Sequence, residues 1–345
     1  MLADVVMRLF TERVTKEGIE AAEKGTWPKD LWEAVVENGL TVPLVPEARG
    51  GAGMTWQDAH VIVVAAGRHA VPLPIAETIV ASALLASAGL DVPSGPITIA
   101  PTHRDETLRL ARRGTEWRVT ATATRVPWGA DAGHAVVVTE VDGRPTVGLL
   151  ATHAAKITRD KSVAQEPRDT LMFEDASVVA AAPAQGVPSD AVWRYGAMIR
   201  AAQIAGGLEY ALAQSTRYAM ERKQFGRPIG SFQAIQHNLA LLAGHTAAAG
   251  MAAANAFRAA DRGDSAFEIA VAKARAGEAA GLGAGIAHQV HGAIGFTYEH
   301  SLHFVTRRLW SWRAEFGGEG YWQAELGRAA TREGGSALWP MVTAR

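Results

Sequence analysis

The chain has 345 residues, 48% of them hydrophobic, so it is long enough to bury a large core and to form two or three packed units. A net charge of -1 provides no basic surface for nucleic acid, and the absence of cysteine excludes thiol catalysis, disulfides and zinc thiolate sites; no metal site is predicted. Neither a signal peptide nor an apolar tract of the roughly 20 residues needed to cross a bilayer is evident, which predicts a cytoplasmic protein without membrane insertion.

Residues 1–93 are predicted to form an α-helical domain. Leu31, Val35 and Leu40 follow a helical spacing that Pro28 should interrupt or start. The stretch 42–53 is rich in Pro and Gly and is expected to be a loop. Further helices are expected over residues 58–67 and 77–88.

Residues 94–186 change to short runs of β-branched residues separated by turn signals. These runs predict a small β-barrel or sandwich as the middle domain. The expected strands cover residues 96–100, 116–122, 134–139, 146–150 and 170–173. Trp128, between two of these runs, is a candidate to lie near a bound cofactor, but it also fits a tryptophan that packs in the core or at an interface.

Residues 187–345 return to a helical period and predict a four-helix bundle with additional helices. The expected helices cover residues 190–223, 232–261, 265–291, 298–312 and 321–333. Long stretches rich in Ala and Gly permit close helix packing, both within one chain and between subunits.

The run 217–236 joins the first two of these helices. The first helix is expected to stop on Gly226, because Pro228 cannot continue it, and Ser231 is expected to cap the next one. Arg222, Gln224 and Gln233 supply the charged and amide donors that an anionic cofactor needs. The alternative is a solvated helix end whose basic residues face the negative end of the helix dipole.

Two motifs carry a family resemblance. The run RYAMERKQFGRPIGSFQAIQ over residues 217–236 and the run QVHGAIGFTYEH over residues 289–300 resemble the two flavin-contacting segments of acyl-CoA dehydrogenases, in the order and at the separation that the family shows. The resemblance implies a mixed, mainly α fold: an N-terminal helical domain, a middle β domain and a C-terminal four-helix bundle.

The resemblance also implies FAD as cofactor and an acyl-CoA thioester as substrate. In the family, a carboxylate removes the α-proton while the β-hydride passes to the flavin. The residues implied to contact FAD are Arg222, Gln224, Phe225, Phe232, Gln233, Gln289, Val290, His291, Gly292 and Ala293. A helix C-cap turn at Gly292 and a packed or capping role for His291 remain alternatives.

The sequence departs from the family pattern at two places. The Thr-Glu-Pro motif that usually opens the middle domain is missing from residues 97–104, which makes flavin support by this chain alone uncertain. The usual position of the base falls on Gly318, and the alternative position early in the first C-terminal helix falls near Gly196. Glu319, next to Gly318, is the candidate base; a solvated loop carboxylate is the alternative.

We therefore expect an acyl-CoA dehydrogenase of fatty acid or sterol degradation, in a homo- or hetero-oligomer such as a dimer of dimers, with an electron-transfer flavoprotein or a similar acceptor. One alternative is a structural subunit without catalytic activity that completes a partner's FAD site. Another is a flavin oxidase or monooxygenase on the same fold. The sequence does not specify the acyl chain.

Overall fold

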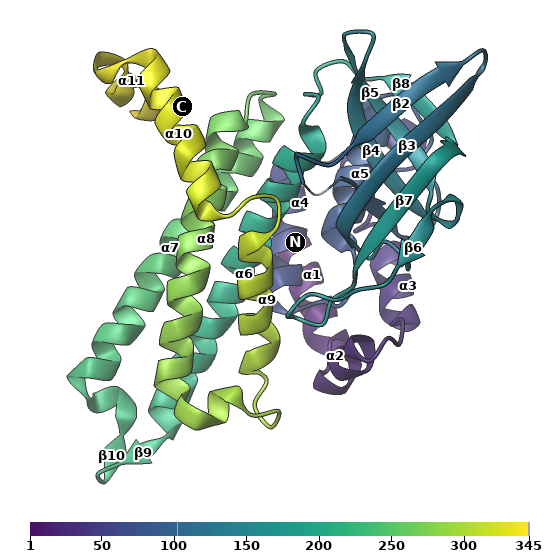
Figure 1. Ribbon diagram of the computed structural model, residues 1–345. Helices are drawn as coiled ribbons and strands as arrows, with labels where there is room; N and C mark the ends of the chain where they lie inside the picture. Colours follow the sequence, from purple (N-terminus) through teal and green to yellow (C-terminus); the bar gives the residue numbers. More distant parts are fainter. Residues whose placement is uncertain (102, 344–345) are drawn as a thin grey trace.

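The computed structural model describes residues 1–101 and 103–343, so Thr102, within the segment compared with the family's Thr-Glu-Pro motif, lies outside the described residues. The chain begins with helices, as predicted (Figure 1). Pro28 is the N-cap of one helix, which confirms that it starts a helix, and Thr55 and Asp58 form a capping box at another. The elements are α1 (Leu2–Arg13), α2 (Lys16–Glu23), α3 (Lys29–Glu37), η1 (Glu47–Arg49), α4 (Trp56–Arg68) and α5 (Ile75–Ser87).

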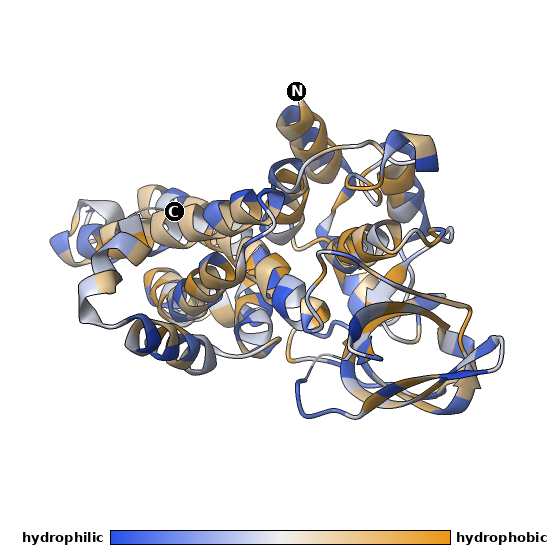
Figure 2. Ribbon diagram, turned by 90° about the horizontal axis from the view of Figure 1, so that it is seen from above, coloured by the Kyte–Doolittle hydropathy of each residue, from blue (hydrophilic) through white to orange (hydrophobic). Residues whose placement is uncertain are grey.

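The middle of the chain forms two four-stranded sheets, ordered β1-β4-β5-β8 and β2-β3-β7-β6. Strand β1 is parallel to β4, and the other pairs are antiparallel. The strands are β1 (Ile97–Ile99), β2 (Leu108–Arg113), β3 (Glu116–Pro127), β4 (His134–Val141), β5 (Arg144–Ala151), β6 (Lys156–Thr158), β7 (Arg168–Ser177) and β8 (Ala180–Pro183), with η2 (Thr152–Ala154) between β5 and β6. Figure 2 shows this β region set to one side of the helices.

Helices return at Ala191 and form the C-terminal bundle, in which α6, α7, α8 and α9 pack against one another. The elements are α6 (Ala191–Glu221), β9 (Lys223–Gln224), β10 (Arg227–Pro228), η3 (Ile229–Ser231), α7 (Gln233–Asp261), α8 (Ala266–His291), η4 (Gly292–Phe296), α9 (Leu302–Ala314), α10 (Glu319–Glu333), η5 (Gly335–Ala337) and α11 (Leu338–Thr343). In the part of the chain that the structure describes, no helix combines the length and apolar character that crossing a bilayer requires.

The connection between α6 and α7 differs from the prediction. The helix ends at Glu221 rather than at Gly226, because Lys223 and Gln224 leave the helix to pair with Arg227 and Pro228 in a short hairpin. Its two turn residues, Phe225 and Gly226, both have positive φ angles (53° and 79°), as a tight two-residue hairpin turn requires.

The predicted cap of α7 was also wrong. The Ser231 hydroxyl donates to the carbonyl of Pro228 and so stabilises the preceding turn of 3-10 helix instead of binding an amide of α7. Phe232 is the N-cap of α7, without a capping side chain.

One large hydrophobic core runs through all three regions, and a smaller core lies between the two sheets. Trp128 is buried and meets Trp27 of the N-terminal region edge to face, with ring centroids 6.2 Å apart. Trp128 therefore packs between the N-terminal and middle regions, which agrees with the alternative of a tryptophan in the core or at an interface. The element types change between Ser87 and Ile97 and between Pro183 and Ala191, while the domain limits 1–93, 94–186 and 187–345 stay a prediction.

Candidate active site

The two motif segments meet at one end of the bundle, where α6 and α8 finish (Figure 1). The ring of Tyr218, in the last turn of α6, stacks on the ring of His291, the last residue of α8, with centroids 4.7 Å apart. We call this end, formed by residues 217–236 and 289–300, the bundle corner. It brings together residues that lie about 70 positions apart in the sequence.

Seven of the ten residues predicted to contact FAD are exposed at the bundle corner: Arg222, Gln224, Phe225, Gln233, Gln289, Gly292 and Ala293. The guanidinium of Arg222 and the side-chain amides of Gln224, Gln233 and Gln289 make no hydrogen bond or ion pair with other described residues. Phe225 is 92% exposed at the tip of the hairpin. Free donors beside an exposed aromatic ring fit the phosphates and planar ring of a dinucleotide cofactor.

The other three predicted contact residues are less accessible. Phe232 is half-buried, and its ring lies under the guanidinium of Arg227, 4.3 Å from ring centroid to Cζ. Val290 is buried, and so is His291, whose Nδ1 lies 2.8 Å from the carbonyl oxygen of Ala287. His291 is therefore packed against its own helix, and its contact with FAD stays a prediction. Gly292 follows α8 as its C-cap residue with a φ angle of 64°, which favours glycine, but its ψ angle of -146° is outside the left-handed helical region of the usual glycine cap.

The segment between α9 and α10, residues 315–318, is called the α9–α10 loop. Its Phe316 is buried and packs directly on Gly196 of α6: a Cβ atom added at Gly196 would lie 2.3 Å from Cδ1 of Phe316. Gly196, one of the two positions at which the family resemblance places a base, is thus packed against the loop that carries the other, Gly318. Phe316 fills the space beside Gly196.

Glu319, the candidate base, is the first residue of α10 and is ion-paired with Arg313. The Arg313 Nε atom lies 3.0 Å from both carboxylate oxygens. The hydrogen bond from Arg313 lowers the pKa of Glu319, although partial burial opposes the shift. A carboxylate with a lowered pKa is a weaker proton acceptor, so Glu319 would have to leave Arg313 to act as a base.

A second carboxylate in the α9–α10 loop was missed by the sequence analysis. Glu315 accepts hydrogen bonds from Arg168 of β7 (Nε, 2.8 Å) and from Arg200 of α6 (Nε, 2.7 Å), and the Ser311 hydroxyl donates to it at 3.0 Å. Burial opposes its ionisation, but the two guanidinium groups outweigh burial and hold its pKa at about 2. The arginines lie 147 and 115 residues away in the chain, so no local pattern reveals the contact.

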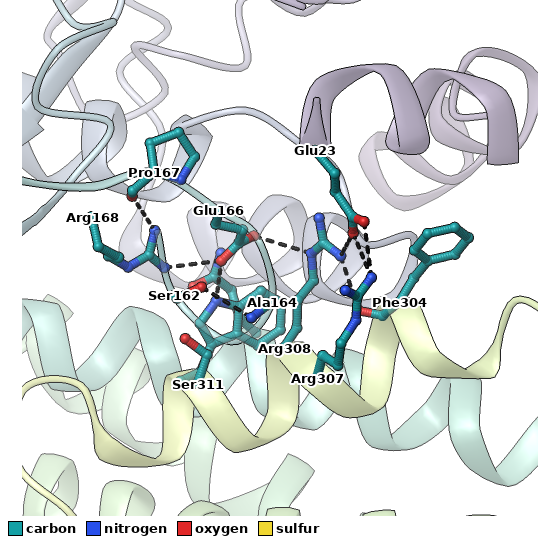
Figure 3. A network of polar contacts seen from close by, with 12 residues as sticks. Glu23, Ser162, Ala164, Glu166, Pro167, Arg168, Phe304, Arg307, Arg308 and Ser311 are labelled. Carbon is teal, nitrogen blue, oxygen red and sulfur yellow. Dashed lines mark hydrogen bonds and ion pairs between the residues drawn. The ribbon is translucent and has the colours of Figure 1, made fainter. Parts of the chain in front are cut away.

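The contacts of Glu315 belong to a longer buried network, part of which Figure 3 shows. Arg168 also donates to Glu166, and Arg308 of α9 donates to the other oxygen of Glu166 at 3.0 Å. Both Arg308 and its neighbour Arg307 pair with Glu23 of α2. At the other end, Arg200 pairs with Glu77 of α5. Carboxylates and guanidinium groups thus alternate across all three regions of the chain.

Two cavities lie near the residues described above, and the smaller one is lined by the α9–α10 loop. The larger, about 660 Å³, is called the α10 pocket and is lined by α6, α8 and α10 residues that include Trp193, Arg194, Phe267, Tyr321 and Trp322. The smaller, about 160 Å³, is called the interdomain pocket and is lined by His103, Arg125, Arg168, Trp310, Glu315 and Phe316 among others. Only the larger reaches the volume typical of ligand sites, about 300 to 1,000 Å³.

Residues 1–91 match the acyl-CoA dehydrogenase N-terminal domain, and residues 193–324 match the acyl-CoA dehydrogenase C-terminal domain. The chain is similar to the acyl-CoA dehydrogenase IpdE2 of Mycobacterium tuberculosis, with 29% identity over 89% of each chain. It is 32% identical to the acyl-CoA dehydrogenase FadE34 of the same organism over 88% of this chain, which spans 42% of FadE34.

Among solved structures, the ChsE4-ChsE5 complex from Mycobacterium tuberculosis has a chain with the same fold, with a TM-score of 0.87, 24% identity and 95% of each chain covered. The Tcur3481-Tcur3483 steroid acyl-CoA dehydrogenase, solved as its G363A variant, gives a TM-score of 0.86 with 26% identity and covers 95% of this chain and 96% of that one. The two domain matches, the relatives and the fold agree with the two motifs at the bundle corner, and the chain belongs to the acyl-CoA dehydrogenase family of flavin-dependent oxidoreductases.

Proposed function

We propose that the chain is one of two unlike chains of a heteromeric acyl-CoA dehydrogenase, in which its bundle corner completes an FAD site held mainly by the partner chain. The observation that carries the proposal is the exposure of the corner. On a projecting end of the bundle, Arg222, Gln224, Gln233 and Gln289 present donors that have no partner among the described residues, so an anionic cofactor bound there needs a second chain to enclose it.

The interior of the chain supports the same proposal. The interdomain pocket, about 160 Å³, is below the usual size of a cofactor site, and the charged pair Arg168 and Glu315 forms part of its wall. Phe316 covers Gly196, one of the two positions at which the family places a base. The ChsE4-ChsE5 complex and the Tcur3481-Tcur3483 steroid acyl-CoA dehydrogenase, each named after two chains, have the same fold.

We propose the α10 pocket as the site for the acyl-CoA thioester. Its volume of about 660 Å³ suits a large ligand, and Arg104, Arg194 and Arg332 provide cationic groups for the phosphates of coenzyme A. Trp193 and Trp322 are stacked, with ring centroids 6.2 Å apart, and give the pocket an apolar wall beside the α9–α10 loop. When bound, the flavin supplies the acceptor for the substrate hydride.

We propose Glu319 as the base that takes the α-proton of the substrate. This carboxylate lies at the start of α10, whose following residues Tyr321 and Trp322 line the α10 pocket. Its hydrogen bond from Arg313 lowers the pKa of Glu319 and keeps the carboxylate ionised. An electron-transfer flavoprotein or a similar acceptor, a dimer of dimers and a cytoplasmic location also stay predictions from the sequence.

A chain without a base of its own is the second candidate, favoured by the packing of Phe316 on Gly196. Such a chain would contribute only the bundle corner to the partner's cofactor. The two candidates make the same prediction for flavin binding and differ in what happens when Glu319 is changed.

Co-expression tests the proposal directly. The chain is produced alone and together with the acyl-CoA dehydrogenase chains encoded beside it, and flavin absorbance, subunit composition and oxygen uptake with acyl-CoA are measured. We expect a colourless chain alone and a yellow complex with one partner, bleached by acyl-CoA without oxygen uptake. A chain that binds FAD fully and oxidises acyl-CoA alone would contradict the proposal, and steady oxygen uptake would indicate an oxidase.

A further inference from the structure

Lys273 of α8 is completely buried, which is unusual for a lysine. Its Nζ atom donates to the carbonyl oxygen of Arg313 at 2.8 Å and to that of Gly317 at 2.7 Å. It makes no ion pair with a described residue. A buried amine that has only backbone carbonyls as partners needs a structural or functional reason, because its desolvation is costly.

The two carbonyls lie where α9 ends and the α9–α10 loop turns toward α10. Arg313 is in the last turn of α9, whose final carbonyls have no partner within the helix, and Gly317 is in the α9–α10 loop. One amine therefore joins the end of α9 to the loop from inside the bundle. The loop borders the interdomain pocket through Glu315 and Phe316, and its Phe316 carbonyl accepts a hydrogen bond from Trp322, which lines the α10 pocket.

Lys273 shares the backbone of the loop with another side chain, that of Trp322, while two arginines hold the side chain of Glu315. The Trp322 indole donates to the carbonyl of Phe316 at 2.9 Å, and Arg200 and Arg168 bind the Glu315 side chain. Gly317 has a φ angle of 86°, so the backbone turns sharply at the residue whose carbonyl Lys273 binds. Without the amine, both partly buried carbonyls would lose this hydrogen-bond donor.

We propose that Lys273 is a positioning residue for the acyl-CoA reaction: it fixes the backbone of the α9–α10 loop and thereby the places of Phe316, which lines the interdomain pocket, and of Glu319, which begins α10. The role in the reaction rests on the proposed function. The mechanical part, the fixing of the loop, does not, and the two parts are measured separately.

The groups that face Lys273 are Glu315 and Glu319, which favour its protonation, and Arg200 and Arg313, which oppose it. Burial has the largest effect and lowers the pKa of Lys273 from 10.5 to about 7. A neutral amine still has two N–H donors for the two carbonyls, so the contact persists above this pH. Because the unfolded chain binds a proton that the folded chain lacks, Lys273 makes stability rise with pH between about 7 and 10.5.

The test compares the full wild-type chain with Lys273→Met, which keeps the shape of the side chain and removes the donor. Amide hydrogen exchange of residues 314–318 should become about tenfold or more faster in the variant, and the rise of stability above pH 7 should disappear. In the flavin-loaded complex, kcat should fall by about the same factor with a smaller change in KM.

The matched control is Phe257→Leu, a substitution at a fully buried residue of α7 that packs against Trp56 and His60 instead of the loop. It should lower overall stability without faster exchange confined to residues 314–318 and without loss of the pH effect. If Lys273→Met does not fold, Lys273→Gln, which keeps a shorter donor, should show the same local change to a smaller extent.

Loop exchange in Lys273→Met as slow as in the wild type would overturn the proposal. Faster loop exchange with unchanged kcat would overturn the role in the reaction. A wild-type chain that takes up no flavin with any partner would instead defeat the proposed function, and the exchange comparison would still decide whether Lys273 holds the loop.

Discussion

Single carboxylates in and beside the α9–α10 loop have opposite surroundings. Glu315 is enclosed by two buried guanidinium groups and a hydroxyl, whereas Glu319, four residues later, has one partly exposed arginine. Removing one member of a buried ion pair lowers the stability of the fold strongly, because the remaining charge stays desolvated. Removing one member of an ion pair near the surface lowers the stability only a little, because water solvates the remaining charge. The two residues should therefore respond to substitution in different ways.

Glu315→Gln should destabilise the chain by about 3 to 5 kcal/mol, because Arg168 and Arg200 would keep their charges in a buried site without the carboxylate. Urea unfolding of the full chain measures the change. Glu325→Gln is the control, since Glu325 pairs with Arg328 at the surface and its loss should cost less than about 1 kcal/mol. Equal effects of the two substitutions would mean that the Glu315 contacts add nothing beyond a surface pair.

Glu319→Gln should leave the flavin spectrum of the complex intact and remove its bleaching by acyl-CoA, if this carboxylate takes the substrate proton. Anaerobic titration with acyl-CoA, followed at the flavin absorbance maximum, measures the loss. Glu278→Gln of α8, a surface carboxylate that pairs with Arg275 and does not line the α10 pocket, should bleach normally. Bleaching of Glu319→Gln at the wild-type rate would assign the base to the partner chain and favour the second candidate function.

At the scale of elements, the bundle corner depends on the ends of α6 and α8. The sequence predicted both helices, because the periodic pattern over about 30 residues is strong, and the family resemblance implied that both motifs contact the same cofactor. It misplaced the end of α6, because a two-strand hairpin around Phe225 and Gly226 competes with the helix and leaves only a short signal. Strand β2 was also missed, since Leu110 is its one fully buried residue.

The candidate site was predictable only in part, for a related reason. Exposed motif residues such as Arg222 and Gln289 are recognisable because they stand in runs of characteristic sequence. Glu315, Lys273 and Phe316 act through contacts with residues more than 40 positions away, such as Arg200 and Gly317, and no local spacing encodes such contacts. Their importance becomes evident only once the helices are packed.

Arg222→Met should weaken FAD binding to the complex by about tenfold or more, because a charge-assisted hydrogen bond to phosphate would be lost at the bundle corner. Flavin fluorescence during titration measures the affinity. Arg217→Met is the matched control: Arg217 lies one turn earlier and donates to Gln214 within α6, so FAD affinity should stay close to that of the wild type. A loss of affinity in both variants alike would favour a general effect of charge at the helix end.

For the whole molecule, stability should fall as the pH drops from about 6.5 toward 4. Burial lowers the pKa of both His60 and His69 from 6.5 to about 4, so the folded chain stays unprotonated in this range while the unfolded chain takes up protons. This part of the stability is complete above pH 6.5. Urea unfolding midpoints between pH 8 and 5 measure it, and His60→Phe should reduce the slope; an unchanged slope would contradict the assignment.

The alternating charges that connect Glu23, Glu166, Glu315 and Glu77 also decide how the polypeptide can be divided. A piece cut anywhere between the three regions would leave guanidinium groups or carboxylates facing apolar surroundings without their counterparts, as Arg200 would be without Glu77. Truncated chains that end at the apparent domain borders should thus aggregate when they are expressed. The three regions should therefore fold and unfold together as one unit.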